Sequence, residues 1–333
     1  MSPVDYRQSG VDIEAGNEAV RRIRSLARGT HTPGVLAGVG SFGGLFALDD
    51  GVADPVLVAS ADGVGTKLKV AFLAGVHNTI GVDLVNHCVN DILVQGACPL
   101  FFLDYLAAAR VAPDVVEQIV SGIAQACRDN ACALLGGETA EMPGFYAAGE
   151  YDVAGFIVGV VARQRIVDGR SIVRGDRLVA LPSSGLHTNG YSLARAIAFD
   201  RLRLRVDSHV GALGETLGTA LLRPHRSYLR VVSPLLDAGR IKGMAHITGG
   251  GITGNLPRTL PEGLAFTIDE RSWTIPPLFL WLQEAGGVST TEMFRAFNMG
   301  VGLVLVCAPA EADAMVRSLQ ALGEAAWILG EVT

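Results

Sequence analysis

Apolar positions recur along the chain with two different periods, and these periods predict both helices and strands. The helical period predicts helices over 13–27, 67–74, 79–96, 113–129, 191–199 and 310–322. In some of these segments charged residues occupy the side opposite the apolar one. Short apolar runs bounded by turn residues predict strands over 56–61, 99–109, 131–135, 153–162, 178–181, 264–268 and 302–307. This alternation predicts a mixed α/β fold.

A polar stretch near the middle of the chain predicts a boundary between two domains. Turn signals occur at Asp168-Gly169 and Arg174-Gly-Asp176. We therefore expect an N-terminal domain over 1–168 and a C-terminal α/β domain over 169–333. The 333 residues, 49% hydrophobic and 18% charged, are enough for two such domains, each with its own core.

Charge and cysteine content narrow the classes of partner. The net charge of −6, without a cluster of Lys and Arg, argues against nucleic acid. No apolar run is long enough to span a bilayer, and the N-terminus has no secretory apolar segment. The five cysteines form no Cys-x-x-Cys pair, which favours reduced cysteines in a cytoplasmic protein.

The segment Asp62-Gly-Val-Gly-Thr-Lys67, at the end of a predicted buried strand, is the strongest candidate for chemistry. A carboxylate suits a hard cation, glycines let backbone N–H groups approach a phosphate, and lysine adds a positive charge. The order of residues is not that of a Walker A loop. The segment therefore predicts a magnesium-bridged phosphate site of another design.

The predicted helix 79–96 is apolar apart from one polar face. Its spacing puts Asp83, Asn86, His87, Asn90 and Asp91 on that face. We favour a functional role for Asn90 and Asp91, which could reach a metal bridging to the Asp62 segment. A lone histidine is more often structural, so we favour a structural role for His87.

Two acidic residues, Glu138 and Glu141, follow the predicted strand 131–135, where α/β sheets often place ligand contacts. Glu138 could complete an oxygen-rich magnesium shell. An ordinary acidic loop is the alternative. We favour a functional role for Glu138, whereas for Glu141 neither interpretation is favoured.

The run Gly38-x-Gly40-x-x-Gly43 matches the dinucleotide-binding fingerprint in letters only. No clear strand precedes it, and residues 45–48 look extended rather than helical. The context therefore argues against an NAD-dependent dehydrogenase, which the run alone would suggest. A flap over nucleotide phosphates and a plain surface loop both remain open.

Two further glycine loops lie in the second half of the chain, at 183–190 and 246–254. Both offer backbone N–H groups and hydroxyls to an anion. Their histidines, His187 and His246, could move protons or donate to a substrate phosphate. A serine hydrolase is excluded for Ser183 and Ser184, since no Gly-x-Ser-x-Gly elbow surrounds them.

Taken together, these motifs resemble the phosphoribosylformylglycinamidine cyclo-ligase (aminoimidazole ribonucleotide synthetase) family over nearly the full length. The resemblance rests on ordered motifs at 6–13, 61–68, 88–91, 99–105, 136–144, 151–156, 187–192, 246–251 and 297–302. It implies a two-domain protein that forms a homodimer, in which the N-terminal sheets pair across the two subunits. It also implies cyclisation of formylglycinamidine ribonucleotide to 5-aminoimidazole ribonucleotide, with ATP converted to ADP and phosphate.

The resemblance assigns roles to individual residues by motif position. Magnesium ligands would be Asp62, Asp91 and Glu138. Contacts to ATP would come from Gly40, Gly43, Asp62, Gly63, Gly65, Thr66, Lys67, Asn90, Asp91 and Gly137. Substrate contacts would come from His187, Thr188, Asn189, Gly190, Thr248, Gly249, Gly250 and Gly251. Catalytic roles would fall to Lys67, His187 and His246.

Two rival functions stay open from the sequence. A neighbouring phosphoryl-transfer activity, such as selenophosphate synthesis, would need a reactive N-terminal cysteine, and none precedes Cys88. A non-catalytic nucleotide-binding module is the other rival, although two separate sets of glycine loops favour two ligands.

Overall fold

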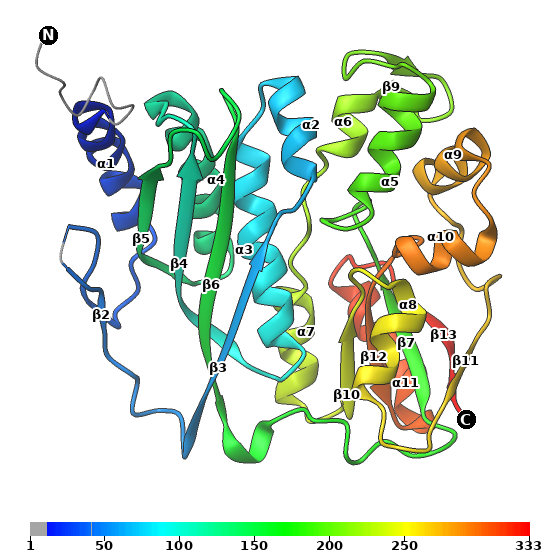
Figure 1. The fold of residues 1–333 in the computed structure, drawn as a ribbon. Coiled ribbons are helices and arrows are strands. Elements are labelled where there is room, and N and C mark those ends of the chain that lie inside the picture. Colours follow the sequence, from blue (N-terminus) through cyan, green and yellow to red (C-terminus); the bar gives the residue numbers. More distant parts are fainter. Residues whose placement is uncertain (1–11, 41) are drawn as a thin grey trace, which may run out of the picture.

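The computed structural model describes residues 12–40 and 42–333, so residues 6–11 of the first motif lie outside the described residues. Figure 1 shows two α/β units side by side, built in turn from the first and second halves of the chain. Within the described ranges, none of the helices combines the length and the apolar character that a bilayer crossing requires.

The first unit packs helices against one face of a sheet. Its elements are α1 (Ile13–Arg28), β1 (Val35–Ala37), β2 (Leu45–Phe46), β3 (Pro55–Gly63), α2 (Lys67–Ala74), α3 (Asn78–Leu93), β4 (Cys98–Ala108), α4 (Pro113–Asp129), β5 (Ala133–Glu141) and β6 (Tyr151–Ala162). The sheet order is β3-β6-β4-β5 among the described residues. Only β4 and β5 pair in parallel, because α4 carries the chain back between them.

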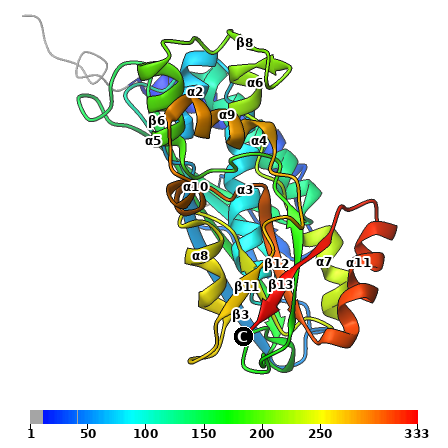
Figure 2. The same ribbon diagram turned by 90° about the vertical axis from the view of Figure 1, so that its right-hand side faces the viewer.

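The second unit is an antiparallel sheet with the order β10-β12-β7-β13-β11. Its elements are β7 (Arg177–Pro182), α5 (Tyr191–Arg195), β8 (His209–Val210), β9 (Glu215–Thr216), α6 (Leu217–Leu221), α7 (Leu229–Asp237), β10 (Gly243–His246), α8 (Gly251–Asn255), β11 (Phe266–Ile268), α9 (Pro277–Gly286), α10 (Thr290–Ala296), β12 (Val301–Cys307), α11 (Ala312–Ala321) and β13 (Trp327–Val332). Figure 2 shows α7 and α11 on one side of this sheet and α8 on the other.

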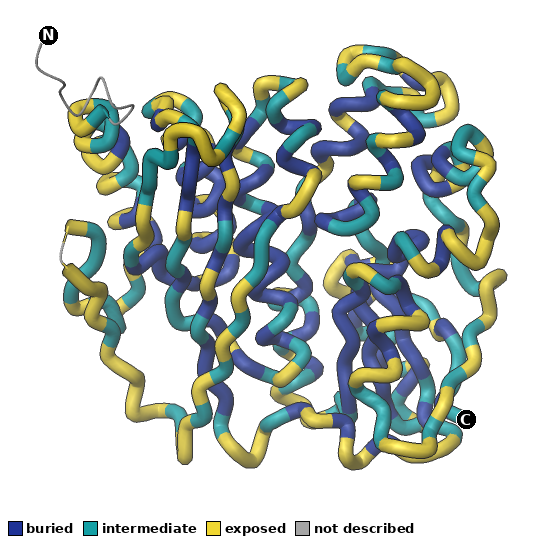
Figure 3. Tube along the Cα trace, viewed as in Figure 1, coloured by how far each residue is buried: buried dark blue, intermediate teal, exposed yellow. Residues whose placement is uncertain are grey.

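Helix α3 lies at the centre of the molecule and contacts both units. It packs against α4 and the first sheet on one side and against α7 on the other. Figure 3 shows the helix mostly in the colour of buried residues. Its polar face is therefore interior: the Asn86 amide donates to the His225 carbonyl at 2.7 Å, and the Asn90 amide donates to the Arg226 carbonyl at 2.8 Å. These bonds satisfy buried amides and join the two units.

The packing of α3 on α4 depends on glycine. A Cβ added to Gly122 would lie 1.9 Å from the Asn78 carbonyl oxygen, and one added to Gly81 would lie 2.1 Å from the Ile119 carbonyl oxygen. The neighbours are backbone atoms, which cannot rotate away as a side chain can.

We expect Gly122→Ala to lower the free energy of unfolding by about 2–3 kcal/mol, because the methyl group forces the two helices apart. Urea unfolding followed by circular dichroism measures this loss. Gly16→Ala on α1 is the matched control, since nothing lies within 4 Å of its added Cβ. Equal stability of the two variants would contradict the close packing.

The mixed α/β prediction is confirmed, and most predicted elements occur within a few residues of their expected bounds. One site-bearing segment differs. Residues 136–141, expected to be a loop after a short strand, continue β5 and pair in parallel with β4 from Leu103 to Ala108. Glycines at 136 and 137 weaken a strand by propensity, but pairing with a long neighbour overrides this local preference.

Candidate active site

A cleft of about 860 Å³ lies between the two units. Its walls come from β3 and α3 on one side and from β10 and the segment after it on the other. The polar side chains that line it include Ser60, Asp62, His87, Asp91, His246, Thr248, Asn255 and Arg258. Three predicted site residues far apart in the sequence, Asp62, Asp91 and His246, thus share one cavity.

Two carboxylates and two imidazoles form a connected chain at this cleft. His87 Nε2 lies 2.9 Å from Asp62 Oδ2 and 3.9 Å from Asp91 Oδ2. His246 Nδ1 lies 2.8 Å from Asp91 Oδ1, and Ser60 Oγ donates to Asp91 Oδ2 at 3.1 Å. The end of β3 and one face of α3 therefore bring the two aspartates to the same imidazole.

The two imidazoles favour the ionised form of both carboxylates. Burial acts to raise the pKa of Asp62 and of Asp91, but hydrogen bonds and charge interactions with His87 and His246 outweigh it and lower both. Burial opposes the charged form of His87, yet its bond to Asp62 and the nearby carboxylates raise its pKa. Burial lowers the pKa of His246, although Asp91 opposes that shift.

Behind the cleft lies a second layer of histidines. His225 Nε2 lies 3.0 Å from His246 Nε2, and the His225 ring stacks on His187 with centroids 3.9 Å apart. Thr188 Oγ1 lies 2.7 Å from His87 Nδ1. Burial holds the pKa of His187 and of His225 well below the ordinary value, so both are neutral.

The structure places His187 and Thr188 in the interior rather than on the cleft. His187 is 1% exposed, and its Nε2 accepts from the Ser184 N–H at 3.1 Å. Thr188 is also buried. In this conformation both side chains fill the space behind the cleft. Neither is exposed enough to make the predicted contact with a substrate. Asn189 and Gly190, next in the loop, are half-buried.

Lys67 also lies elsewhere than expected. Its side chain is 0% exposed, and Nζ lies 2.8 Å from Asp83 Oδ2, with further bonds to the carbonyls of Arg223 at 2.8 Å and His187 at 3.2 Å. The ammonium is thus surrounded by acceptors and cannot face a phosphate without leaving them. Asn90 is likewise wholly interior.

The Asp62 segment reaches the surface only in part. Gly65 is exposed and has a φ of +63°, with open space where a side chain would lie. Thr66 Oγ1 lies 3.1 Å from Ser192 Oγ in the second unit. Gly63 ends β3 next to Asp62.

The remaining predicted ATP and metal residues lie at the other edge of the sheet. Glu138 and Gly137 are on β5, whereas Asp62 lies near the end of β3, with β6 and β4 between these strands. Three strand spacings amount to about 14 Å. The hairpin of β1 and β2, which carries Gly40 and Gly43, also lies beside β5 (Figure 1). Within one chain these residues do not join the cleft.

The second glycine loop is held by one asparagine. Asn255 Nδ2 donates to the carbonyls of Thr248, Gly249 and Gly251. Gly250 and Gly251 have φ values of +95° and +61°, and a Cβ on Gly251 would lie 1.9 Å from the Phe294 carbonyl oxygen. Only glycine fits at position 251, so this loop is fixed beside the cleft wall at Thr248.

Sequence reasoning missed two members of the site. His225 was not singled out, because Arg223-Pro-His-Arg226 has no periodic pattern and no motif. His87 was interpreted as structural, although it links Asp62 to Asp91. Its position on the same helical face as Asp91, four residues away, was the available signal.

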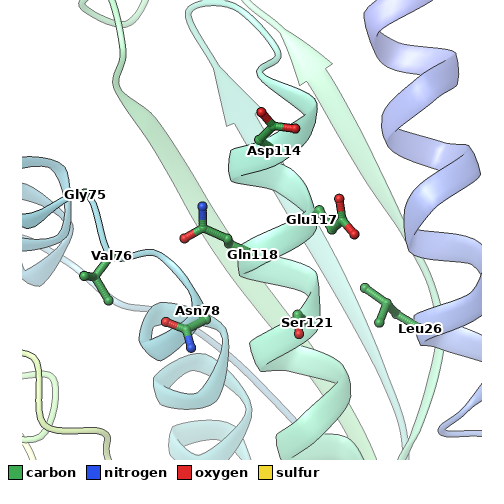
Figure 4. Close-up of a pocket in the computed structure, with 8 residues that line it drawn as sticks. All are labelled: Leu26, Gly75, Val76, Asn78, Asp114, Glu117, Gln118 and Ser121. Carbon is green, nitrogen blue, oxygen red and sulfur yellow. The ribbon is translucent and has the colours of Figure 1, made fainter.

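A separate hollow of about 490 Å³ lies between α1, α4 and the segment before α3, away from the cleft (Figure 4). Its acids Asp114 and Glu117 are paired with Arg22 at 2.6 and 3.0 Å. Surface acids paired with an arginine do not by themselves make a catalytic site, so we assign the chemistry to the cleft.

Comparison with known proteins identifies the family. Residues 47–161 match the family model "AIR synthase related protein, N-terminal domain", and residues 173–333 match the corresponding C-terminal domain model. The chain is 55% identical over 328 residues to the phosphoribosylformylglycinamidine cyclo-ligase of Trichlorobacter lovleyi, covering 98% of this chain and 94% of that protein.

Solved structures share the fold at low identity. The thiamine-monophosphate kinase from Stenotrophomonas maltophilia matches with a TM-score of 0.70 at 19% identity, over 95% of this chain and 93% of that chain. The hydrogenase maturation protein HypE in complex with ATP matches with a TM-score of 0.65 at 18% identity, over 94% and 85%. On its two matched domains and its near full-length identity, this chain belongs to the phosphoribosylformylglycinamidine cyclo-ligase family of AIR synthase related proteins.

Proposed function

We propose that this chain catalyses the ATP-dependent cyclisation of formylglycinamidine ribonucleotide to 5-aminoimidazole ribonucleotide, with release of ADP and phosphate. The observation that carries the proposal is the cleft, where Asp62 and Asp91 of the first unit meet His246 and the Thr248 loop of the second. The family membership supports the same reaction.

The donor set of the cleft fits Mg²⁺ with a nucleotide. Asp62 and Asp91 are partly exposed and ionised, and carboxylate oxygens are the protein ligands that Mg²⁺ accepts beside water and phosphate. Bound there, Mg²⁺ would neutralise charge on the transferred phosphoryl group. A HypE structure with ATP shares this fold, which supports ATP as the phosphoryl donor.

The chemistry explains why ATP is needed. An amide oxygen leaves poorly, whereas phosphorylation of the formyl oxygen creates an imidate from which phosphate leaves as the amidine nitrogen closes the ring. The protein holds both ends of one substrate together, which favours the intramolecular attack. His246 is one of two imidazoles at the cleft, and its Nε2, 3.0 Å from His225 Nε2, is placed to pass a proton between the cleft and the interior.

Direct assay tests the function. Purified protein with formylglycinamidine ribonucleotide, ATP and Mg²⁺ is expected to form ADP and aminoimidazole in equal amounts. ADP formation without aminoimidazole, or no turnover, would overturn the proposal. ADP formation is expected to require the ribonucleotide, because its formyl oxygen accepts the phosphoryl group.

We further propose a homodimer in which the first sheets of two subunits pair. The face of this sheet opposite the helices exposes large apolar side chains: Leu57 at 57%, Phe156 at 44% and Tyr105 at 37%. Glu138 lies opposite Tyr105 in register, so it belongs to the same open face. A second copy that covers this face, with its β5 edge near β3, would supply Glu138 and the Gly40 hairpin to the partner's cleft.

Mixing two inactive variants tests this arrangement. We expect Glu138→Gln and Asp91→Asn to be inactive alone. Unfolded and refolded together, they should recover about a quarter of the wild-type activity, because random two-fold dimers regain one intact site in half of the molecules. Activity that stays at the level of the single variants would place both residues in one subunit's site.

We also infer that the protein works in the cytoplasm. All five cysteines are free, and four of them are buried. Reduced, buried cysteines of this kind are typical of a reducing compartment.

A further inference from the structure

The acids that the proposed function assigns to Mg²⁺ are accompanied by two imidazole nitrogens. His87 Nε2 faces Asp62 and Asp91, and His246 Nδ1 faces Asp91. One ligand atom from each of His87, Asp91 and His246 lies within 4.8 Å of the others, and all three residues line the cleft together with Asp62. Two nitrogens and the Asp91 carboxylate are therefore close enough to share one ion, and Asp62 adjoins them through His87.

The far nitrogens of both rings have partners that hold the rings in place. His87 Nδ1 lies 2.7 Å from Thr188 Oγ1, which can accept its proton. His246 Nε2 lies 3.0 Å from His225 Nε2, which can accept its proton. Histidines that ligate metals usually donate their other N–H in this way, so an ion that binds here would take the place of the hydrogen bonds between the facing nitrogens and the carboxylates.

The deeper set of His187, His225 and His246 is also compact, with ligand atoms within 4.8 Å. It fits a cation less well. His187 Nε2 already accepts from the Ser184 N–H, so its proton belongs on Nδ1. His225 Nε2 is the nitrogen that can accept from His246 Nε2, at 3.0 Å. The partners of these nitrogens are N–H groups, which cannot ligate an ion, whereas the partners of His87 Nε2 and His246 Nδ1 are carboxylates, which can ligate the same ion.

Donor type decides which ion such a site prefers. Mg²⁺ is a hard cation that takes oxygen ligands and keeps several waters. Imidazole suits first-row transition ions, and two histidines with carboxylates are a common set for them. A site that binds only Mg²⁺ does not need two imidazole nitrogens beside its carboxylates, because Mg²⁺ prefers oxygen ligands.

We propose that His87, His246, Asp62 and Asp91 form a centre for a divalent transition-metal ion, held more tightly than Mg²⁺. The proposal rests on the proposed function in taking these aspartates as metal ligands. It differs in adding His87 and His246 to the coordination shell and in naming the class of ion. Thr188 acts as a positioning residue, through its bond to His87.

Spectroscopy on the wild-type protein tests the shell without any substitution. Metal-free protein loaded with one equivalent of Mn²⁺ is expected to show ¹⁴N imidazole couplings in pulsed electron paramagnetic resonance. Excess Mg²⁺ should leave these couplings in place. A spectrum with oxygen and water ligands only, or loss of bound Mn²⁺ at an equal concentration of Mg²⁺, would overturn the proposal.

Variants then show which histidines supply the nitrogen ligands. Their Zn²⁺ affinity is measured by competition with a coloured chelator. Loss of a ligand in His87→Gln or His246→Gln should weaken Zn²⁺ binding by on the order of 100-fold or more, and loss of support in Thr188→Val by about 10–100-fold. His209→Gln, on the exposed strand β8, is the matched control and should bind as the wild type does. Equal affinity across all four variants would contradict the assignment.

The same preparations separate this inference from the proposed function. Cyclisation with Mg²⁺, but without nitrogen couplings, would keep the function and overturn the imidazole centre. Nitrogen couplings in a protein that does not cyclise the ribonucleotide would establish the centre and overturn the function.

Discussion

Asp91→Asn is expected to keep the fold and to lower kcat/KM for ADP formation by about 10³-fold, the size of effect seen when a preorganised charge contact is removed from a reaction centre. Asp91 is the carboxylate that His246, Ser60 and His87 all approach, within 2.8, 3.1 and 3.9 Å. The amide keeps its shape but removes the negative charge that a metal ion requires. Steady-state ADP release with saturating ribonucleotide measures the loss.

Stability should change little in this variant. The amide oxygen still accepts from His246, and the amide nitrogen can donate to Ser60, so the buried polar atoms keep partners. Asp114→Asn is the matched control: it also lies on a helix, but its side chain is 84% exposed and pairs with Arg22. Normal cyclisation by Asp91→Asn would remove Asp91 from the metal centre.

The sequence predicted the parts of the site that depend on local pattern. Helical spacing correctly put Asp83, His87 and Asp91 on one face of α3, and the apolar run before Asp62 correctly predicted β3. Their meeting with His246 is a contact between units, across more than 150 residues, which periodicity does not encode. The polar face of the helix suggested a metal shared by Asp91 and the Asp62 segment, but no pattern in the sequence placed His246 beside them.

Other site residues could not be placed because tertiary contacts decide them. Glu138 is next to glycines, which read locally as a loop, but β4 draws this segment into the sheet. Lys67 belongs to a segment that looks like a phosphate site, but whether its ammonium faces solvent depends on where Asp83 lies, one helix later. Both outcomes follow from pairing with distant residues, so no local pattern could have shown them.

Lys67→Met is expected to lower the free energy of unfolding by about 3–5 kcal/mol, because removing one member of a buried ion pair leaves the other charge without compensation. Asp83 is 0% exposed, and its Oδ1 also accepts from the His225 N–H at 2.6 Å. The carbonyls of His187 and Arg223 would lose a donor in the same change. Thermal and urea unfolding measure the effect, with Lys69→Met as the control.

Lys69 lies two residues away in the same helix and pairs with Glu150 at a half-exposed site. Exposed pairs contribute about 0–1 kcal/mol, so the control should remain close to the wild type. Lys67→Met/Asp83→Asn should recover part of the loss, since the amide is uncharged and keeps an oxygen for His225.

These variants also decide between the two roles of Lys67. The sequence suggests a phosphate contact, which predicts weaker ATP binding with little change in stability. The buried pair predicts the reverse: a loss of stability that the Asp83→Asn change partly restores. A Lys67→Met protein as stable as the wild type, with a raised KM for ATP, would show that the ammonium leaves Asp83 to meet the phosphates. Recovery in the double variant would show that Lys67 joins the two units. Lys67 would then position the walls of the cleft without contacting the nucleotide.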